Sequence, residues 1–246
     1  MHNPLSLDNK CIFVTGASSG IGRSVAIECA KMGARLFITG RDNERLQETL
    51  SMLEGSDHEA IVADLLHNSD IMGLVAKLPS LDGIVFSAGI NDKSLVKFVN
   101  EEKIARMFGT NFTAPLLLIQ ALLKQKKMNK GASVVLISSI SATYATITNA
   151  LYSSTKGALN SLLRVLALEL SSQGIRVNGI SPGPIRTKLI KTYELADDFA
   201  AFEKAIPLGR IGEPEDVANC ALFLLAGSSQ WMTGSLITLD GGITLR

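Results

Sequence analysis

The sequence contains few cysteines, few aromatic residues and almost no net charge. Its 246 residues include 3 cysteines and 5% aromatic residues, and 24 basic side chains are balanced by 23 acidic ones. The cysteines lie far apart, without a Cys-x-x-Cys pair or a neighbouring histidine, so they predict neither a metal site nor a redox site. A net charge of +1 provides no global attraction to nucleic acid or to an anionic membrane, and we expect neither partner.

The sequence also lacks a recognisable secretory signal and a membrane-spanning segment. No basic stretch followed by an apolar one occurs at the start, and the longest apolar run, Ala114–Leu123, is interrupted by Gln120. A transmembrane helix needs about 20 apolar residues, so we expect a cytoplasmic protein. Because 46% of the residues are hydrophobic, one large core is available, and we expect residues 1–246 to form a single domain.

Short apolar runs alternate with longer amphipathic stretches, which predicts an α/β fold built from βαβ units around a parallel sheet. Most of the short runs are nearly continuous in apolar residues, as expected for strands that helices cover on both faces. Seven strands are predicted, at Cys11–Thr15, Arg35–Thr39, Glu59–Ala63, Gly83–Ser87, Ser133–Ser138, Arg176–Ile180 and Leu236–Leu239. Long helices are predicted at about Glu101–Leu123 and Asn149–Ser172, and Glu213-Pro214 opens another helix.

A glycine-rich turn follows the first predicted strand and runs directly into a helix. Its sequence is Gly16-Ala17-Ser18-Ser19-Gly20-Ile21-Gly22. Glycines at such a junction let the backbone approach a pyrophosphate, and the helix N-terminus offers free N–H groups and a partial positive charge. The alternative is a plain tight turn. The position after the first strand of a βαβ unit favours a dinucleotide site.

The end of the second predicted strand indicates which dinucleotide is bound. Enzymes that use NAD place a carboxylate there for the ribose 2′-hydroxyl, whereas a 2′-phosphate requires a cation. The strand ends in Thr39-Gly40-Arg41, and the Arg41 guanidinium is suited to a phosphate. A solvated arginine paired with Asp42 or Glu44 is the alternative, and Ser19 supplies no second cation. We expect NADP(H) to be favoured over NAD(H).

Two further strand ends carry residues suited to the rest of the nucleotide. Asp64 follows the third predicted strand, and Ser87-Ala88-Gly89 ends the fourth. Carboxyl ends of parallel strands bind ligands in open α/β sheets, so Asp64 is placed for an adenine amine and Gly89 leaves room for a ribose. An ordinary aspartate cap and glycine turn are equally compatible with these residues.

A tyrosine, a lysine and a serine form a candidate acid–base group. Tyr152 and Lys156 are four residues apart in a predicted helix and so share one face, and Ser139 ends the fifth predicted strand thirteen residues earlier. An ammonium group beside a phenol lowers the phenol pKa from about 10 toward neutrality, which makes tyrosine a usable acid or base. A serine hydroxyl then suits a substrate carbonyl oxygen. The alternatives are an ordinary tyrosine, a snorkelling lysine and a strand-end serine.

Taken together with Asn111 and Pro182-Gly183, these motifs resemble the short-chain dehydrogenase/reductase family, in order and at the right intervals over nearly the whole chain. The resemblance implies one Rossmann-type doubly wound domain, strand order 3-2-1-4-5-6-7, and hydride transfer between NAD(P)H and a carbonyl or alcohol carbon. It implies that Tyr152 exchanges a proton with the substrate oxygen, that Lys156 lowers the Tyr152 pKa and binds the nicotinamide ribose, and that Ser139 orients the carbonyl.

The resemblance assigns the remaining site residues and an assembly. Asn111 would hold a water that links Lys156 to solvent. Further cofactor contacts are implied for Leu65, Pro182, Gly183, Ile185 and Thr187. The family commonly has Asn-Asn-Ala-Gly where this chain has Phe86-Ser87-Ala88-Gly89, so we expect altered packing around the ribose rather than lost binding. A homotetramer is expected, and no metal is implied.

The substrate is the least determined feature. The chain most resembles the 3-oxoacyl-(acyl carrier protein) reductase group, including the ending Leu239-Asp240-Gly241-Gly242, which many sugar and polyol dehydrogenases share. A 3-oxoacyl thioester is the first hypothesis and a sugar or polyol the alternative; a non-catalytic dinucleotide sensor is the alternative from another class. Arg186–Pro207 is predicted to be a substrate lid rather than a surface excursion. A cluster of lysines could bind an acidic carrier protein, and the alternative is an ordinary solvated surface. Its members are Lys124, Lys126, Lys127 and Lys130.

Overall fold

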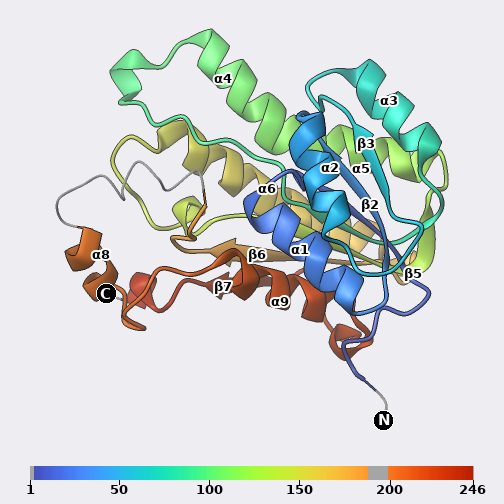
Figure 1. Ribbon diagram of the computed structural model, residues 1–246. Coiled ribbons are helices and arrows are strands. Elements are labelled where there is room, and N and C mark those ends of the chain that lie inside the picture. Colours follow the sequence, from blue (N-terminus) through green and yellow to red (C-terminus); the bar gives the residue numbers. More distant parts are fainter. Residues whose placement is uncertain (1–2, 188–198, 246) are drawn as a thin grey trace.

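The chain forms one seven-stranded parallel sheet with helices on both faces (Figure 1). The computed structural model describes residues 3–187 and 199–245. The strand order is β3-β2-β1-β4-β5-β6-β7, which confirms the predicted topology. The strands are β1 (Cys11–Thr15), β2 (Arg35–Gly40), β3 (Glu59–Val62), β4 (Leu81–Phe86), β5 (Met128–Ile137), β6 (Arg176–Pro182) and β7 (Leu236–Leu239).

Successive residues of the central strands enter two separate cores, because side chains alternate between the faces of a sheet. In β1, Phe13 joins the core on one face, whereas Ile12 and Val14 join the core on the other. In β4, Ile84 belongs to the same core as Phe13, and Val85 belongs to the other. Nearly continuous apolar strands are therefore explained by burial on both faces.

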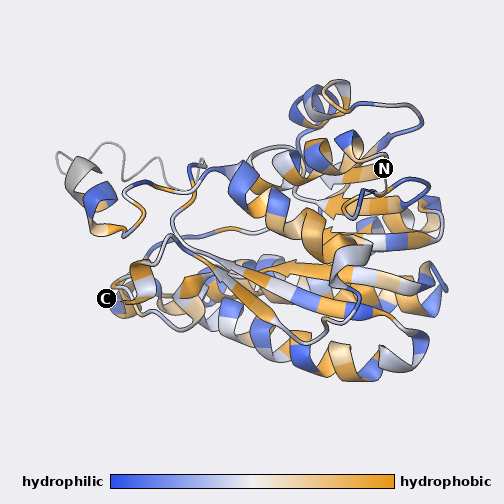
Figure 2. Cartoon of the chain, turned by 90° about the horizontal axis from the view of Figure 1, so that it is seen from below, coloured by the Kyte–Doolittle hydropathy of each residue, from blue (hydrophilic) through white to orange (hydrophobic). Residues whose placement is uncertain are grey.

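Helices cover both faces of the sheet (Figure 1), and each set contributes side chains to one of these two cores. The first core contains residues of α3 (Asn68–Lys77), α5 (Ala114–Lys124) and α6 (Ala150–Glu169). The second contains residues of α1 (Gly20–Lys31), α2 (Asn43–Ser51) and α9 (Pro214–Leu225). Polar residues gather on the outer surfaces of the helices and apolar residues lie against the sheet (Figure 2). No helix in the described ranges is long and apolar enough to span a bilayer.

The helix predicted over Glu101–Leu123 is interrupted, which corrects the sequence prediction. It comprises α4 (Glu101–Phe108), a π-helical turn at Gly109–Thr113, and α5. Pro115, in the first turn of α5, has no N–H, and its ring would clash with the carbonyl group of Asn111 in a regular α-helix. A wider turn relieves that clash, and it places Asn111 in the buried interior.

The segment predicted to be a lid, Arg186–Pro207, is partly described. Its residues 188–198 lie outside the described residues. Its end contains α8 (Phe199–Ala205), which Figure 1 shows on the side of the molecule toward which β6 and β7 point. Arg186 forms ion pairs with Glu203, at 3.2 Å, and with Glu213, at 2.9 Å.

Candidate active site

A glycine-rich turn joins β1 to α1 at the edge of the sheet where the strands end. Gly16 has φ = +68°, and a Cβ atom there would lie 2.8 Å from the backbone of Ala88. A Cβ atom on Gly22 would lie 2.5 Å from the carbonyl oxygen of Gly16. Neither position has room for a side chain, so the turn brings three backbone segments together. The N-terminus of α1 then borders a pocket that is also lined by Ser18, Ser19, Gly20 and Ile21.

A hydrogen-bond network holds this turn against α2, and no sequence motif had indicated it. Arg23 donates from Nη2 to the Ser18 carbonyl oxygen and from Nε to the Thr49 hydroxyl, both at 2.9 Å. Thr49 is fully buried on α2, and its hydroxyl lies 2.8 Å from the carbonyl oxygen of Ala17. Because buried polar groups are costly to leave unpaired, these contacts fix the turn in place.

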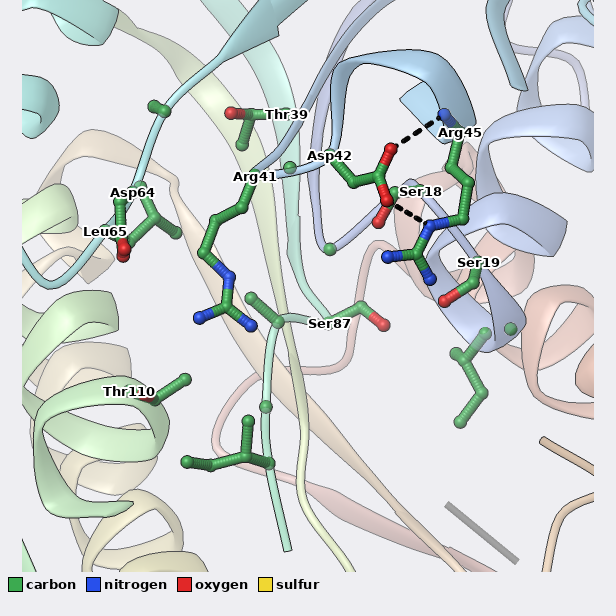
Figure 3. A pocket seen from close by; sticks show the side chains of 18 of the residues that line it. Ser18, Ser19, Thr39, Arg41, Asp42, Arg45, Asp64, Leu65, Ser87 and Thr110 are labelled. Atoms are coloured by element: carbon green, nitrogen blue, oxygen red, sulfur yellow. Dashed lines mark hydrogen bonds and ion pairs between the residues drawn. The ribbon is translucent and has the colours of Figure 1, made fainter. Parts of the chain in front are cut away.

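Two arginines line the same pocket near the end of β2. Figure 3 shows the Arg41 guanidinium inside the pocket, near Ser87, and the Arg45 guanidinium beside Ser18 and Ser19. The Asp42 carboxylate accepts hydrogen bonds from the backbone N–H and the Nε of Arg45, at 3.1 and 2.5 Å. It therefore caps α2 and orients Arg45. Arg45 was not among the predicted residues, although its position in the first turn of the helix after β2 is a usable signal.

The remaining predicted nucleotide residues lie at neighbouring strand ends and line this pocket. They are Asp64, Leu65, Ser87, Ala88 and Gly89. The Thr15 hydroxyl accepts from the backbone N–H groups of Ser87 and Ala88, at 3.1 and 3.2 Å, which ties the segment after β4 to β1. Thr110, in the π-helical turn, also lines the pocket and was not predicted (Figure 3).

A second pocket adjoins the first and contains the candidate acid–base group. Ser139 follows β5, and Tyr152 and Lys156 lie one turn apart on α6; all three line this pocket. The Ser139 and Tyr152 side chains are hydrogen-bonded. Four residues line both pockets, which makes them continuous: Ile21, Ser87, Gly89 and Thr187. The predicted nicotinamide neighbours also line the second pocket, namely Pro182, Gly183 and Ile185.

The pKa of Tyr152 shifts in the direction opposite to that expected from the sequence. Burial raises the pKa of its hydroxyl, and the hydrogen bond with Ser139 opposes that rise. The Lys156 ammonium lies 5.6 Å from the centre of the Tyr152 ring and donates to the Ile137 carbonyl oxygen at 2.8 Å. Lys156 is therefore held by the backbone rather than by the phenol oxygen. Its own burial lowers the pKa of Lys156 to about 8.

Asn111 is buried in the π-helical turn and bonds to the backbone after β4. Its Oδ1 accepts from the N–H of Ile90 at 2.8 Å, and its Nδ2 donates to the carbonyl oxygen of Ile90 at 2.9 Å and to the Thr155 hydroxyl at 3.1 Å. The side chain thus joins the segment after β4 to α6, next to Lys156. The water relay implied for Asn111 stays a prediction.

The lysine cluster lies away from this site. β5 begins at Met128 and its carboxyl end, at Ile137, leads to Ser139. Met128 pairs with Leu81 at the start of β4, and Leu136 pairs with Phe86 at its end, so about 17 Å of strand separates them. The lysines lie near the starting edge of the sheet, opposite the site: Lys124, Lys126, Lys127 and Lys130. Lys127 also donates to the carbonyl oxygen of Leu78 there. This cluster does not surround the mouth of the pocket.

Comparisons with known proteins agree with this geometry. A family model described as "Enoyl-(Acyl carrier protein) reductase" matches residues 16–244. A glucose and ribitol dehydrogenase of Daucus carota is 33% identical over 96% of this chain and 85% of its own length. A 3-oxoacyl-[acyl-carrier-protein] reductase of Rickettsia felis is 30% identical over 98% of this chain and 99% of its own. A crystal structure of a putative 2-deoxy-D-gluconate 3-dehydrogenase from Agrobacterium tumefaciens, with bound NADP, has a TM-score of 0.90 and 28% identity and covers 100% of both chains.

Burial of Lys156 predicts that Lys156→Met stabilises the protein. Lowering the lysine pKa from 10.5 to about 8 corresponds to about 3 kcal/mol, and loss of the bond to Ile137 offsets about 1 kcal/mol of it. Below pH 8 Lys156 is protonated in both the folded and the unfolded chain, so the variant gains the full amount of stability. This gain in stability decreases between pH 8 and 10.5, because in that range Lys156 loses its proton in the folded chain but keeps it in the unfolded chain.

Thermal unfolding without cofactor at pH 7 and pH 9.5 measures this effect. We expect Lys156→Met to raise Tm by a few degrees at pH 7 and by clearly less at pH 9.5. Lys77→Met, at an exposed position of α3, is the control for loss of a charge. An equal change in Tm at both pH values would contradict the assigned burial penalty.

Proposed function

The chain belongs to the short-chain dehydrogenase/reductase family of oxidoreductases, which act on alcohols and carbonyls with a nicotinamide cofactor, and we propose that it uses NADP(H). The observation that supports this most directly is the pair of continuous pockets, one with the glycine turn and two arginines, the other with Ser139, Tyr152 and Lys156. The donor set fits the cofactor: a helix N-terminus suits the pyrophosphate and cations suit the 2′-phosphate.

The proposed preference for NADP(H) is supported by how the charges are arranged. Arg41 and Arg45 line the nucleotide pocket from two sides (Figure 3). Asp42 is the first carboxylate after β2. It accepts hydrogen bonds from the backbone N–H and from the Nε of Arg45, and it is therefore not directed at a ribose. The same pairing gives the guanidinium of Arg45 a fixed orientation, which favours a charge-assisted bond to phosphate.

In the proposed reaction the cofactor supplies or takes the hydride, and the chain handles the proton. During reduction Tyr152 donates its hydroxyl proton to the substrate oxygen, and during oxidation it removes that proton. Ser139 hydrogen-bonds to Tyr152 and is placed to donate to the same oxygen. Lys156, buried below the tyrosine ring, stabilises the phenolate that remains after proton transfer.

Two substrate classes are compatible with this chemistry. The 3-oxoacyl thioester hypothesis is supported by the similarity to the Rickettsia felis reductase. The sugar or polyol alternative is supported by the hydroxyl and amide groups that line the second pocket, among them Ser141, Thr146 and Asn149. The lysine cluster lies at the opposite edge of the sheet, so it does not supply cations for an acidic carrier protein at the mouth of the pocket. A non-catalytic sensor gains no support, because it needs no proton donor.

We also propose a homotetramer. The exposed side of α6 carries Val165 and Leu168, with 50% and 78% of their surface accessible. Apolar groups on a long helix next to the site are suited to contact with a second copy of the chain. Light scattering should give a mass close to four times the 26.3 kDa of one chain, and Leu168→Glu should lower it. A monomeric mass for the unmodified chain would overturn this proposal.

Tyr152→Phe tests the mechanism. We expect it to lower kcat for reduction of a small diketone by about 10²- to 10⁴-fold, because it removes the proton donor and keeps the ring. Fluorescence titration should show nearly unchanged NADPH affinity. Ser154→Ala, which removes an exposed hydroxyl from the same helix outside the pocket, is the control. Activity retained in Tyr152→Phe would exclude the assigned proton donor.

Arg41→Ala and Arg45→Ala test the cofactor preference. Each variant should weaken NADPH binding by about 10- to 100-fold, the usual loss for a charge-assisted bond, with little effect on NADH. Arg164→Ala, at an exposed position of α6, controls for the loss of a cation. Equal losses for NADPH and NADH would show that neither arginine contacts the 2′-phosphate.

A further inference from the structure

The second pocket has a polar wall beyond the reacting groups. We define the polar wall as Asn91, Lys93, Ser141, Tyr144, Thr146 and Asn149. These residues come from two loops, one after β4 and one between β5 and α6. Apolar side chains complete the lining of the pocket, among them Pro184, Phe202 and Ile243. A ligand in this pocket therefore meets hydrogen-bonding groups in one region and apolar groups in another.

The polar wall is held together before any ligand binds. The N–H of Ser94 donates to the carbonyl oxygen of Thr148 at 2.9 Å, which joins the two loops. Asn91 donates from Nδ2 to Asn149 Oδ1 at 3.3 Å, and Asn149 donates from Nδ2 to the Thr146 hydroxyl at 2.6 Å. Oδ1 of Asn91 is buried and has no hydrogen-bond partner among the described residues. A hydroxyl donor that reached this amide after a small rotation would satisfy it.

The wall also carries positive charge. Among the described residues that line the pocket, the cations are Lys93 and Lys156, and none is Asp or Glu. Lys156 is buried beneath Tyr152, whereas Lys93 is exposed at the loop after β4. The neighbouring carboxylate, Asp92, forms an ion pair with Arg106 of α4. The pocket thus presents a cation to the part of a substrate that extends past Ser139.

We propose that the polar wall binds a hydroxylated carboxylic acid, with Lys93 as the ligand of its carboxylate; this rests on the proposed function. The amides and hydroxyls of the wall suit the hydroxyl groups of such a substrate, and the ammonium of Lys93 suits its anionic end. In the oxidation, a secondary alcohol carbon gives its hydride to NADP⁺, and the hydroxyl proton passes to the phenolate oxygen of Tyr152, which becomes the neutral hydroxyl. The products are the oxo acid and NADPH.

Paired substrates that differ only in charge test the proposal. The probes are straight-chain aldonates of four to six carbons, such as D-gluconate, and the alditols of the same length, which replace the carboxylate by a hydroxymethyl group. We expect the unmodified enzyme to prefer an aldonate in kcat/KM, and Lys93→Met to reduce that preference by about 10- to 100-fold, mainly through KM. Lys93→Arg should retain most of it.

Lys97→Met is the matched control, because Lys97 is on the same loop, exposed, and does not line the pocket. It should leave the aldonate preference at its original value. A wild-type enzyme that shows no preference for any aldonate, or that prefers a neutral 3-oxoacyl thioester, would overturn the substrate inference. So would an unchanged preference in Lys93→Met.

Failure of the proposed function gives a different result. Calorimetric titration of gluconate into the enzyme–NADP⁺ complex measures binding without turnover. If no alcohol or carbonyl probe reacts while gluconate binds and Lys93→Met weakens that binding, the polar wall stands and the oxidoreductase chemistry is wrong. If a small diketone is reduced while gluconate neither binds nor reacts, the chemistry stands and the inference about Lys93 is wrong.

Discussion

All seven strands run in the same direction, and the location of the whole site depends on that constraint. The carboxyl ends of parallel strands lie at one edge, so residues far apart in sequence meet there. Gly16 follows β1, Arg41 follows β2, and Ser139 follows β5. The helices start at the same edge, which adds the N-terminus of α1 and its unpaired N–H groups. A cofactor pocket and a reaction pocket therefore become continuous at one edge of the sheet.

The reaction pocket includes a charged group in an unfavourable place. Lys156 is only 5% exposed, and among the described residues its hydrogen-bond acceptor is one backbone carbonyl, that of Ile137. A buried ammonium with a single neutral partner lowers stability, because desolvation exceeds what that bond returns. Such strain is typical of functional sites, where stability and activity conflict. Next to the lysine, Asn111 ties the segment after β4 to α6.

Sequence patterns predicted those parts of the site that follow directly from strand ends and helix periodicity. The glycine turn, Ser139 and the Tyr152–Lys156 pair are of this kind, and the predicted strand order is confirmed. Arg45 was missed although its position in the first turn of α2 is a usable signal, whereas the Arg23–Thr49 network depends on how α1 and α2 pack. The lysine cluster precedes the predicted fifth strand, whereas Ser139 follows it, so the strand itself separates the two; in the structure Met128 pairs with Leu81 at the start of β4, at the edge opposite Ser139.

The two halves of the site are constructed differently, and this explains why the cofactor is easier to infer than the substrate. The nucleotide pocket is lined by strand ends and a helix N-terminus, whose backbone positions are fixed by the core. The polar wall is lined by two loops joined through Ser94 and Thr148. Loops accept substitutions that strands do not. A change at Lys93 therefore alters what the pocket recognises while the sheet, the glycine turn and Tyr152 keep their positions, so one fold supports many substrates.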